Sequence, residues 1–280
     1  MNMTFTDSDK GKKNLGYLAI FTVHLVPVIA LFTGTHTVDW IVLACLWPIQ
    51  ALGSTLGLHR YFAHKSFRTS RLFQGFLALC AAFAFGNPIG FAGKHRIHHK
   101  YSDMINDVHA PRQGAWQCWI GSLVDFGHSD AEVRRHCVDL CRYPELVWLH
   151  EHKWVPGLAL ALILFLVGGF SMMAIGFALG VVSIIHLGGA VNYFCHKYGS
   201  RRFETGDNST NIWILSLLSL GESWHNNHHF YPASARAGFY WWEIDLAYLV
   251  ICLLQKMGLI WAVRTPPERI TLTHSASLAR

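Results

Sequence analysis

Charged residues are scarce in this chain. Asp, Glu, Lys and Arg make up 14% of its 280 residues, against roughly 25% in ordinary soluble domains, while hydrophobic residues make up 52%. This balance excludes a disordered chain and argues against a nucleic-acid partner. The 24 glycines show no triplet period, which excludes collagen, and the seven cysteines include no CxxC pair, which argues against a disulfide scaffold.

Four long stretches contain at most one charged residue each. They cover residues 15–33, 38–58, 154–170 and 172–191. The first corresponds to roughly 28 Å of helix, enough to cross a bilayer, and no small-residue cleavage site of a signal peptide follows it. Very short turns join the first stretch to the second and the third to the fourth. We therefore expect four transmembrane helices arranged in two hairpins.

The basic residues predict the orientation. All 23 Lys and Arg residues lie in segments 1–14, 60–153 and 192–280, and neither hairpin turn contains one. Because positive charge marks the cytoplasmic side, both termini and both long polar segments are expected in the cytoplasm. The chain then divides into a tail (1–14), a single membrane domain (15–265, with 60–153 and 192–265 cytoplasmic) and a second tail (266–280).

Two further apolar runs are expected at the membrane surface instead of across it. The run 72–92 contains Asn87-Pro88, and spanning would place basic segments on opposite sides of the membrane. The run 243–263 carries Glu243, Asp245 and Lys256, which is typical of an amphipathic surface helix.

Histidine is abundant, with 18 residues, and three clusters stand out. They are HxxxxH at 59–64 and HxxHH at 95–99 and at 225–229. Because positions i, i+3 and i+4 share a helix face, each HxxHH cluster directs two or three imidazoles to one spot. The HxxxxH pair lies about 140° apart on a regular helix, so it converges only if the helix ends or distorts between the two histidines. A fourth element is Asn192-x-x-x-His196, where the last span ends.

In the expected topology all these histidines face the cytoplasm and converge. The nine are His59, His64, His95, His98, His99, His196, His225, His228 and His229. A structural zinc site takes four ligands, so nine fit two metal ions better. Imidazole suits iron, zinc, copper and nickel, and ligand counting leaves the metal open. Attack on unactivated C–H bonds of a lipid substrate would require a redox metal and O₂, which favours iron. Asp107, near the second cluster, is expected to orient a ligand imidazole.

The clusters at 59–64, 95–99 and 225–229, with NxxxH at 192–196, resemble those of the integral-membrane fatty acid desaturases of the stearoyl-CoA Δ9 type. The likeness extends from about Gly53 to Pro232 and includes the four-span topology. It implies an all-α membrane protein whose cytoplasmic helical cap holds a di-metal site. It also implies two iron ions on the nine histidines, O₂ as oxidant and a saturated acyl substrate. Asn192 would contact the metals through water, and Glu222, in the third cluster, is expected beside the ligands.

The sequence departs from the family pattern in two places. Acyl-CoA members commonly place Arg-Asp before the second cluster, where this chain has Gly93-Lys94. The acyl carrier is therefore open between CoA, acyl carrier protein and a membrane lipid ester. The haem-binding HPGG motif of an appended cytochrome b5 domain does not occur. Electrons are therefore expected from a separate protein of the ferredoxin, rubredoxin or cytochrome b5 type.

Two other functions compete with desaturation. A membrane di-iron hydroxylase shares the histidine clusters and the oxidant but inserts oxygen, and the NxxxH element together with the spacing of the clusters favours a desaturase. A metal transporter would need polar ligands in mid-span. Only His24 and His186 lie well inside the expected spans, which argues against transport.

The second span carries candidate residues for an acyl tunnel. Trp47, Ala51 and Thr55 fall at i, i+4 and i+8, on one stripe of the helix that ends in His59. Trp47 lies roughly 18 Å along this helix from His59. In the desaturases that this chain resembles, the tunnel runs beside this helix, so Trp47 is the expected floor and Ala51 leaves room above it. The alternative is that Trp47-Pro48 is a packing residue at a helix kink.

Overall fold

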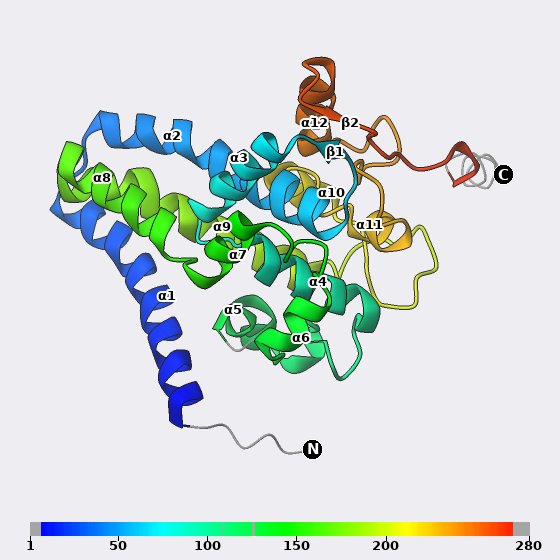
Figure 1. Ribbon diagram of the computed structural model, residues 1–280, viewed down its shortest axis with the longest axis horizontal. Coiled ribbons are helices and arrows are strands. Elements are labelled where there is room, and N and C mark those ends of the chain that lie inside the picture. The colour runs from blue at the N-terminus through cyan, green and yellow to red at the C-terminus, as the bar shows by residue number, and fades with distance from the viewer. Residues whose placement is uncertain (1–6, 108, 125–126, 271–280) are drawn as a thin grey trace.

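The computed structural model describes residues 7–107, 109–124 and 127–270, and it is mostly helical (Figure 1). The first part of the chain contains α1 (Asp7–Thr33), α2 (Thr37–Leu52), the π-helix η1 (Gly53–Ala63), β1 (Arg68–Thr69), α3 (Arg71–Ala82), α4 (Pro88–Tyr101), the 3-10 helix η2 (Pro111–Gln113), the π-helix η3 (Gln117–Gly121), α5 (Ser122–Val124), α6 (Asp130–Arg135) and α7 (Pro144–Glu151). The second part contains α8 (Val155–Ser171), the π-helix η4 (Met172–Ala178), α9 (Leu179–Phe194), α10 (Trp213–Leu218), α11 (His225–Phe230), α12 (Leu246–Lys256) and β2 (Ile260–Trp261).

Among the described residues, three helices are long and apolar enough to cross a membrane: Lys13–Thr33, Thr37–Ala63 and Val155–Phe194. The third is 40 residues long, and Gly169 interrupts it with a φ of 74°, a left-handed conformation that favours glycine. The chain reverses there, because Leu160, Ala161 and Leu164 of α8 pack against Phe177, Ala178 and Val181 beyond it. The two stretches predicted as the third and fourth spans therefore lie side by side.

The two expected tails are described only in part. Helix α1 begins at Asp7, within the segment 1–14 that was expected as a tail. Residues 1–6 and 271–280 lie outside the described residues, so both predicted tails are only partly described.

Neither of the two surface runs forms a single long helix. The run 72–92 is broken at Asn87, whose side chain accepts a hydrogen bond from the amide of Gly90 and so begins α4. The run 243–263 contains α12 and then β2, which pairs antiparallel with β1. The fold is mostly helical, as expected, and also includes this two-stranded sheet. Its strands are two residues each, too short to show in the sequence.

The main hydrophobic core fixes the segments that carry histidines. It joins η1, α3, α4, α7 and α12 through Phe62, Leu77, Ile89, Leu146 and Ile251, all nearly inaccessible to solvent. Burial of each such side chain contributes about 1.5–3 kcal/mol. Since Phe62 and Ile89 lie on the helices that carry His59 and His95, the same packing positions these histidines.

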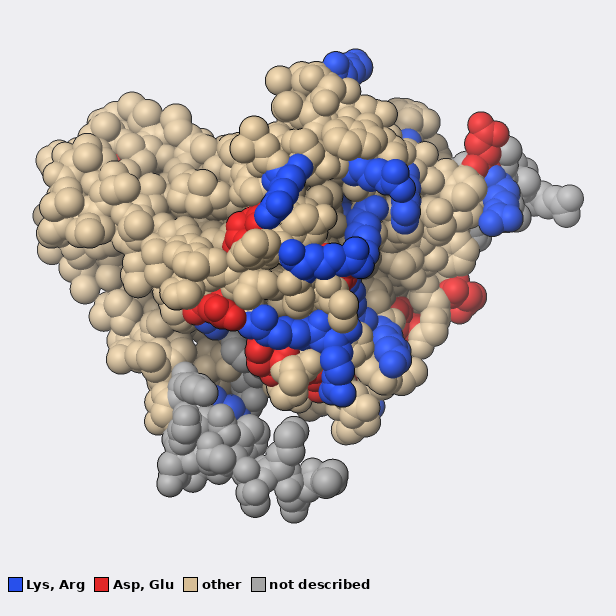
Figure 2. Space-filling model, in the orientation of Figure 1, with Lys and Arg blue, Asp and Glu red and all other residues tan. Residues whose placement is uncertain are grey.

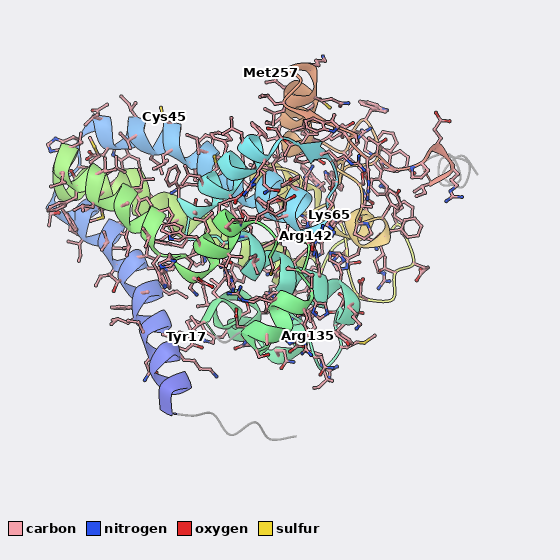
Figure 3. The ribbon with its side chains drawn as sticks, viewed as in Figure 1. Tyr17, Cys45, Lys65, Arg135, Arg142 and Met257 are labelled. Carbon is pink, nitrogen blue, oxygen red and sulfur yellow. The ribbon has the colours of Figure 1, made fainter. Side chains whose placement is uncertain are left out.

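Charge divides the molecule into two parts. Figure 2 shows Lys and Arg gathered over one region of the surface, while the part formed by α2 and α8 shows almost no charge in this view. Lys65, Arg135 and Arg142 lie in the charged region, and Cys45 of α2 lies in the uncharged one (Figure 3). The uncharged part exposes large apolar side chains such as Leu166 and Val167. This surface fits contact with lipid.

Candidate metal centre

The π-helical segment η1 brings the two histidines of the first cluster together. The amide of His64 donates to the carbonyl of His59 at 3.2 Å, a bond across five residues instead of four. A π-helical turn is wider than an α-helical one and repeats every five residues in its hydrogen bonds. His59 and His64 therefore lie on the same side, and the distortion that the HxxxxH spacing requires is present.

The nine histidines form two groups, one of five and one of four, and each HxxHH cluster contributes to both. On α4, His95 and His99 belong to one group and His98 to the other. On α11, His225 and His229 belong together, and His228 joins the first group. Positions i and i+4 are about 40° apart around a helix, and i+3 lies on the other side of position i. The spacing itself therefore allows the imidazoles at i and i+4 to face one group while the imidazole at i+3 faces the other.

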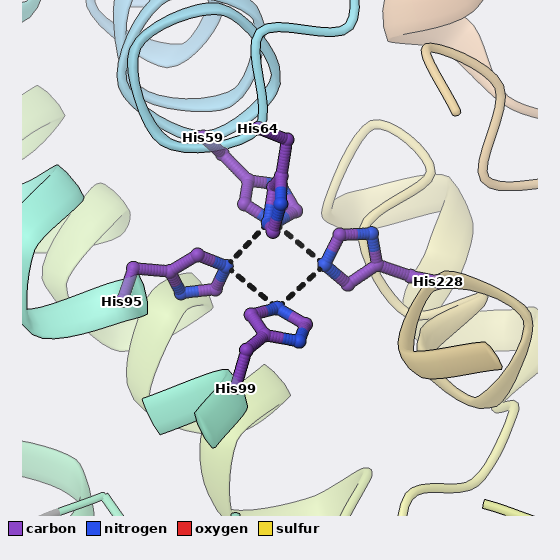
Figure 4. Close-up of side chains that lie close together, drawn as sticks. All are labelled: His59, His64, His95, His99 and His228. Carbon is purple, nitrogen blue, oxygen red and sulfur yellow. Dashed lines mark hydrogen bonds between the residues drawn. The ribbon is translucent and has the colours of Figure 1, made fainter. Parts of the chain in front are cut away.

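The five-histidine group consists of His59, His64, His95, His99 and His228, whose ligand atoms all lie within 4.8 Å of one another. Figure 4 shows the ring that they form. Contacts between Nε2 atoms join His64 to His95 at 2.8 Å, His95 to His99 at 3.0 Å, His99 to His228 at 3.0 Å and His228 to His59 at 3.1 Å.

The four-histidine group consists of His98, His196, His225 and His229, with ligand atoms again within 4.8 Å of one another. The Nε2 atoms of His196 and His225 are 2.9 Å apart. The two groups are adjacent, since the rings of His99 and His229 lie 4.4 Å apart between centroids. All nine histidines that the sequence predicted are thus brought together.

This donor set fits bound metal ions. In the five-histidine group, the Nε2 atoms of His95, His99 and His228 each face two other Nε2 atoms. A single ring nitrogen cannot donate to one neighbour and accept from another at the same time. In the four-histidine group, the buried Nε2 of His229 has no hydrogen-bond partner within the described part of the chain. A cation at the centre of each group would satisfy these nitrogens. Nine imidazoles suit iron, zinc, copper or nickel.

The surroundings of His95, His99 and His225 keep these three imidazoles neutral. Burial, followed by the neighbouring histidines, lowers the pKa of His95, His99 and His225 well below the ordinary value. Neutral imidazole is the form that binds a metal. The site is therefore ready to bind metal at neutral pH without first losing protons from these rings.

Four carboxylates each contact one imidazole of the two groups. In each pair the imidazole donates from Nδ1. His98 donates to Asp107 at 2.9 Å, His196 to Asp103 at 3.0 Å and His229 to Asp207 at 2.6 Å. His59 donates to Glu222 in the same way. Since an ionised carboxylate only accepts, the proton lies on Nδ1 and the lone pair of Nε2 faces the group.

All four carboxyl groups are ionised at neutral pH, since the pKa of each lies below its ordinary value. Burial raises the pKa of Asp107 and of Glu222, but the partner imidazoles, and for Glu222 also Arg60, outweigh it and lower both values to about 2. Burial also raises the pKa of Asp207, but the hydrogen bond from His229 outweighs it and leaves this pKa well below its ordinary value.

Sequence reasoning expected Asp107 and Glu222 beside the ligands, and the structure places them there. It missed Asp103 and Asp207. Asp103 lies four residues after His99, a spacing that offered a weak signal, whereas Asp207 approaches His229 from a loop with no recognisable motif.

A buried arginine connects the five-histidine group to α12. Arg60 donates from Nε to Glu222 at 3.0 Å and from Nη1 to Asp245 at 3.0 Å. Asp245 also begins α12 by accepting from the amide of Tyr248. Arg96, one residue after His95, is partly buried and pairs with Asp139.

The remaining predicted residues lie along α2, η1 and α9. Asn192 is half-buried, one turn before His196 on α9. Trp47 donates from its indole to the hydroxyl of Ser183 at 2.6 Å. Ala51 is buried, and the hydroxyl of Thr55 donates to its carbonyl. Their roles stay predictions.

Comparison with known proteins agrees with this site. A model of the family described as fatty acid desaturase matches residues 37–251. The chain is 37% identical to an sn-1 stearoyl-lipid 9-desaturase of Anabaena variabilis, over 95% of this chain and 100% of that protein. The chain belongs to the fatty acid desaturase family.

Other relatives of this desaturase are named for position 9 or for position 5 of the acyl chain. It is 35% identical to a Delta-9 acyl-lipid desaturase 2 of Arabidopsis thaliana, over 93% of this chain and 86% of that protein. It is 36% identical to an icosanoyl-CoA 5-desaturase of Limnanthes douglasii, over 90% of this chain and 72% of that protein. All nine histidines lie inside the matched segment. The desaturase is thus an oxidoreductase of fatty acid metabolism that acts on acyl chains.

Proposed function

We propose that this desaturase introduces a cis double bond at the Δ9 position of a saturated, lipid-bound acyl chain, using O₂ and two iron ions held by the nine histidines. The observation that carries the proposal is the pair of adjacent imidazole groups at the ends of the apolar helices. Gly93-Lys94 in place of Arg-Asp, and the acyl-lipid desaturases among the relatives, support a membrane lipid over CoA or acyl carrier protein as the carrier.

The residues of the chain position the reactants. Iron at the two groups would supply the O₂-dependent chemistry that removes two hydrogens from adjacent methylene carbons. The carboxylates Asp103, Asp107, Asp207 and Glu222 hold the imidazoles in one tautomer and one orientation. Asn192, one turn before His196, would reach the centre through a water molecule. A separate protein of the ferredoxin, rubredoxin or cytochrome b5 type would deliver the electrons.

The membrane arrangement belongs to the same proposal. Spans near 15–33, 38–58, 154–170 and 172–191 would form two hairpins within one domain over 15–265. The cytoplasmic cap would consist of 60–153 and 192–265, and both termini would face the cytoplasm. The absence of Lys and Arg from both hairpin turns supports this orientation. Exposed Leu72, Phe76 and Leu249 on α3 and α12 support contact of these helices with the membrane surface.

The test is lipid analysis in a host that makes only saturated acyl chains, with the full chain and an electron donor expressed together. We expect new monounsaturated chains with the double bond at carbon 9, found on glycerolipids before they appear on free thioesters. Hydroxylated chains would instead support a di-iron hydroxylase. The His98→Ala variant, expressed to the same level in the membrane, is the control and should leave the chains saturated.

A further inference from the structure

The carboxylates are distributed unequally between the two groups of histidines. Three of the four imidazoles in the four-histidine group donate to an aspartate, namely His98, His196 and His229. In the five-histidine group, Glu222 is the one carboxylate in contact with an imidazole among the described residues, and its partner is His59.

The charge of Glu222 is also shared. Its Oε1 atom accepts from both Nε and Nη2 of Arg60, at 3.0 and 2.9 Å. A guanidinium in such a contact offsets the negative charge that the carboxylate directs at His59. Because Arg60 also pairs with Asp245, it offsets the charge of Glu222 only in part, and the five-histidine group faces less than one full carboxylate charge.

The three aspartates are held by neutral groups. Asp107 accepts from the backbone amides of Asp103 and His109, at 3.0 and 2.9 Å. Asp103 accepts from the amide of Asn208 at 2.7 Å. These contacts fix the carboxylates without a cation, so they direct their full charge at the imidazoles.

Asp207 is held in the same way. Its Oδ1 atom accepts from the amide of Ser209 at 3.0 Å and from the hydroxyl of Thr205 at 2.7 Å. Its Oδ2 atom is left for His229. The four-histidine group is thus backed by three carboxylates from two loops.

We propose that the two groups are unequal metal sites, and that the four-histidine group binds a divalent metal ion first and more tightly because of Asp103, Asp107 and Asp207. An imidazole that donates to a carboxylate is a stronger ligand through its other nitrogen, and losing one such partner weakens metal binding roughly 10–100-fold. Three charged partners therefore outweigh the one additional neutral imidazole of the other group. This inference rests on the proposed function, since it assumes that both groups bind metal.

The test is a cobalt titration of the full chain, purified in detergent and freed of metal with a chelator. Co²⁺ is used because its visible absorption reports each nitrogen-bound ion separately from any activity. We expect two phases. His225→Ala should remove the tighter phase, and His95→Ala should remove the weaker one, which assigns each phase to its group.

Isosteric variants then test the role of the aspartates. Asp207→Asn should weaken the tighter phase roughly 10–100-fold and leave the weaker phase unchanged. Asp103→Asn should do the same, and asparagine tolerates the φ of 60° at this position. Glu222→Gln should change only the weaker phase. Asp139→Asn, which removes a carboxylate that pairs with Arg96 and Lys65 outside both groups, should change neither.

The outcomes separate this inference from the proposed function. A chain that binds no cobalt would overturn the proposed metal centre. Two ions bound with equal affinity, loss of the tighter phase in His95→Ala, or an unchanged tighter phase in Asp207→Asn would overturn the inequality of the sites alone.

Discussion

The amide of His64 donates to the carbonyl of His59, one π-helical turn earlier in the chain. This bond turns two histidines that would point apart on an α-helix toward one centre. The wide turn is kept in place by α3, which lies against it. A Cβ added at Gly53, where the π-helix begins, would lie 2.4 Å from the amide nitrogen of Ala81 and 2.5 Å from the carbonyl carbon of Cys80.

Gly53→Ala should therefore destabilise the protein. The added methyl group meets backbone atoms that cannot rotate away, so α3 must move, at a cost of about 1–3 kcal/mol. The midpoint of thermal unfolding in detergent measures the effect. Gly75→Ala is the matched control, because nothing lies within 4 Å of its added Cβ and alanine favours a helix by up to about 1 kcal/mol. Equal shifts in both variants would contradict the close approach of η1 and α3.

His98→Ala and His228→Ala should each remove one ligand from one group. We expect the wild-type chain to carry about two irons and each variant about one or fewer, with loss of activity, because a site that lacks a ligand holds its ion weakly. Iron per chain is measured by elemental analysis of the purified membrane protein. His152→Ala is the control, since His152 is exposed and stacks on Trp148. Full iron and full activity in both test variants would contradict the assignment of the ligands.

Asn192→Ala should separate metal binding from turnover. A residue that reaches the centre through water does not hold the metal directly, so the variant should keep most of its iron while losing activity. The measurement is iron content together with product formed per chain. Loss of iron in parallel with activity would show instead that Asn192 supports the fold of the site.

The histidine clusters could be predicted from the sequence because their geometry is local. The separation i, i+3 and i+4 fixes which imidazoles share a helix face, and the HxxxxH spacing itself required a distorted helix. The division into five and four histidines depends on how α4 and α11 face each other. That arrangement is set by tertiary packing, and sequence spacing contains no information about it.

The carboxylates that contact the imidazoles could not all be predicted, because tertiary packing brings them to the site. Asp103 meets His196 across 93 residues and Asp207 meets His229 from a loop, and neither position belongs to a motif. Arg60 makes contacts of the same kind, because it is buried against Glu222 and Asp245. Its position directly after His59 gave no sign that Glu222 and Asp245 would surround it.

Arg60→Gln should be strongly destabilising. Arg60 is buried and pairs with both Glu222 and Asp245, so its loss leaves two carboxylates without their shared cation, at a cost of about 3–5 kcal/mol. Arg60→Lys should rescue only part of this loss, because one ammonium cannot replace a fork that contacts both partners. Chemical unfolding of the metal-free chain measures these differences.

Arg71→Gln is the control for Arg60. Arg71 also pairs with a carboxylate, Glu145, but its side chain is 64% exposed, and such pairs contribute about 0–1 kcal/mol. A loss in Arg60→Gln as small as that in Arg71→Gln would contradict the buried network.

The length of the acyl chain should be determined beside α2. The indole of Trp47 is fixed by its hydrogen bond to Ser183 of α9, and Ala51 is buried one turn closer to the histidines. Trp47→Ala should admit longer acyl chains, and Ala51→Leu should restrict the enzyme to shorter ones, because the first removes the expected floor of the tunnel and the second raises it.

Ser183→Ala is the matched control, since it removes the hydrogen bond of the indole but not its volume. Chain-length analysis of the products, with iron content unchanged, makes the comparison. If both test variants keep the parental profile, the floor lies elsewhere and Trp47 only packs α2 against α9.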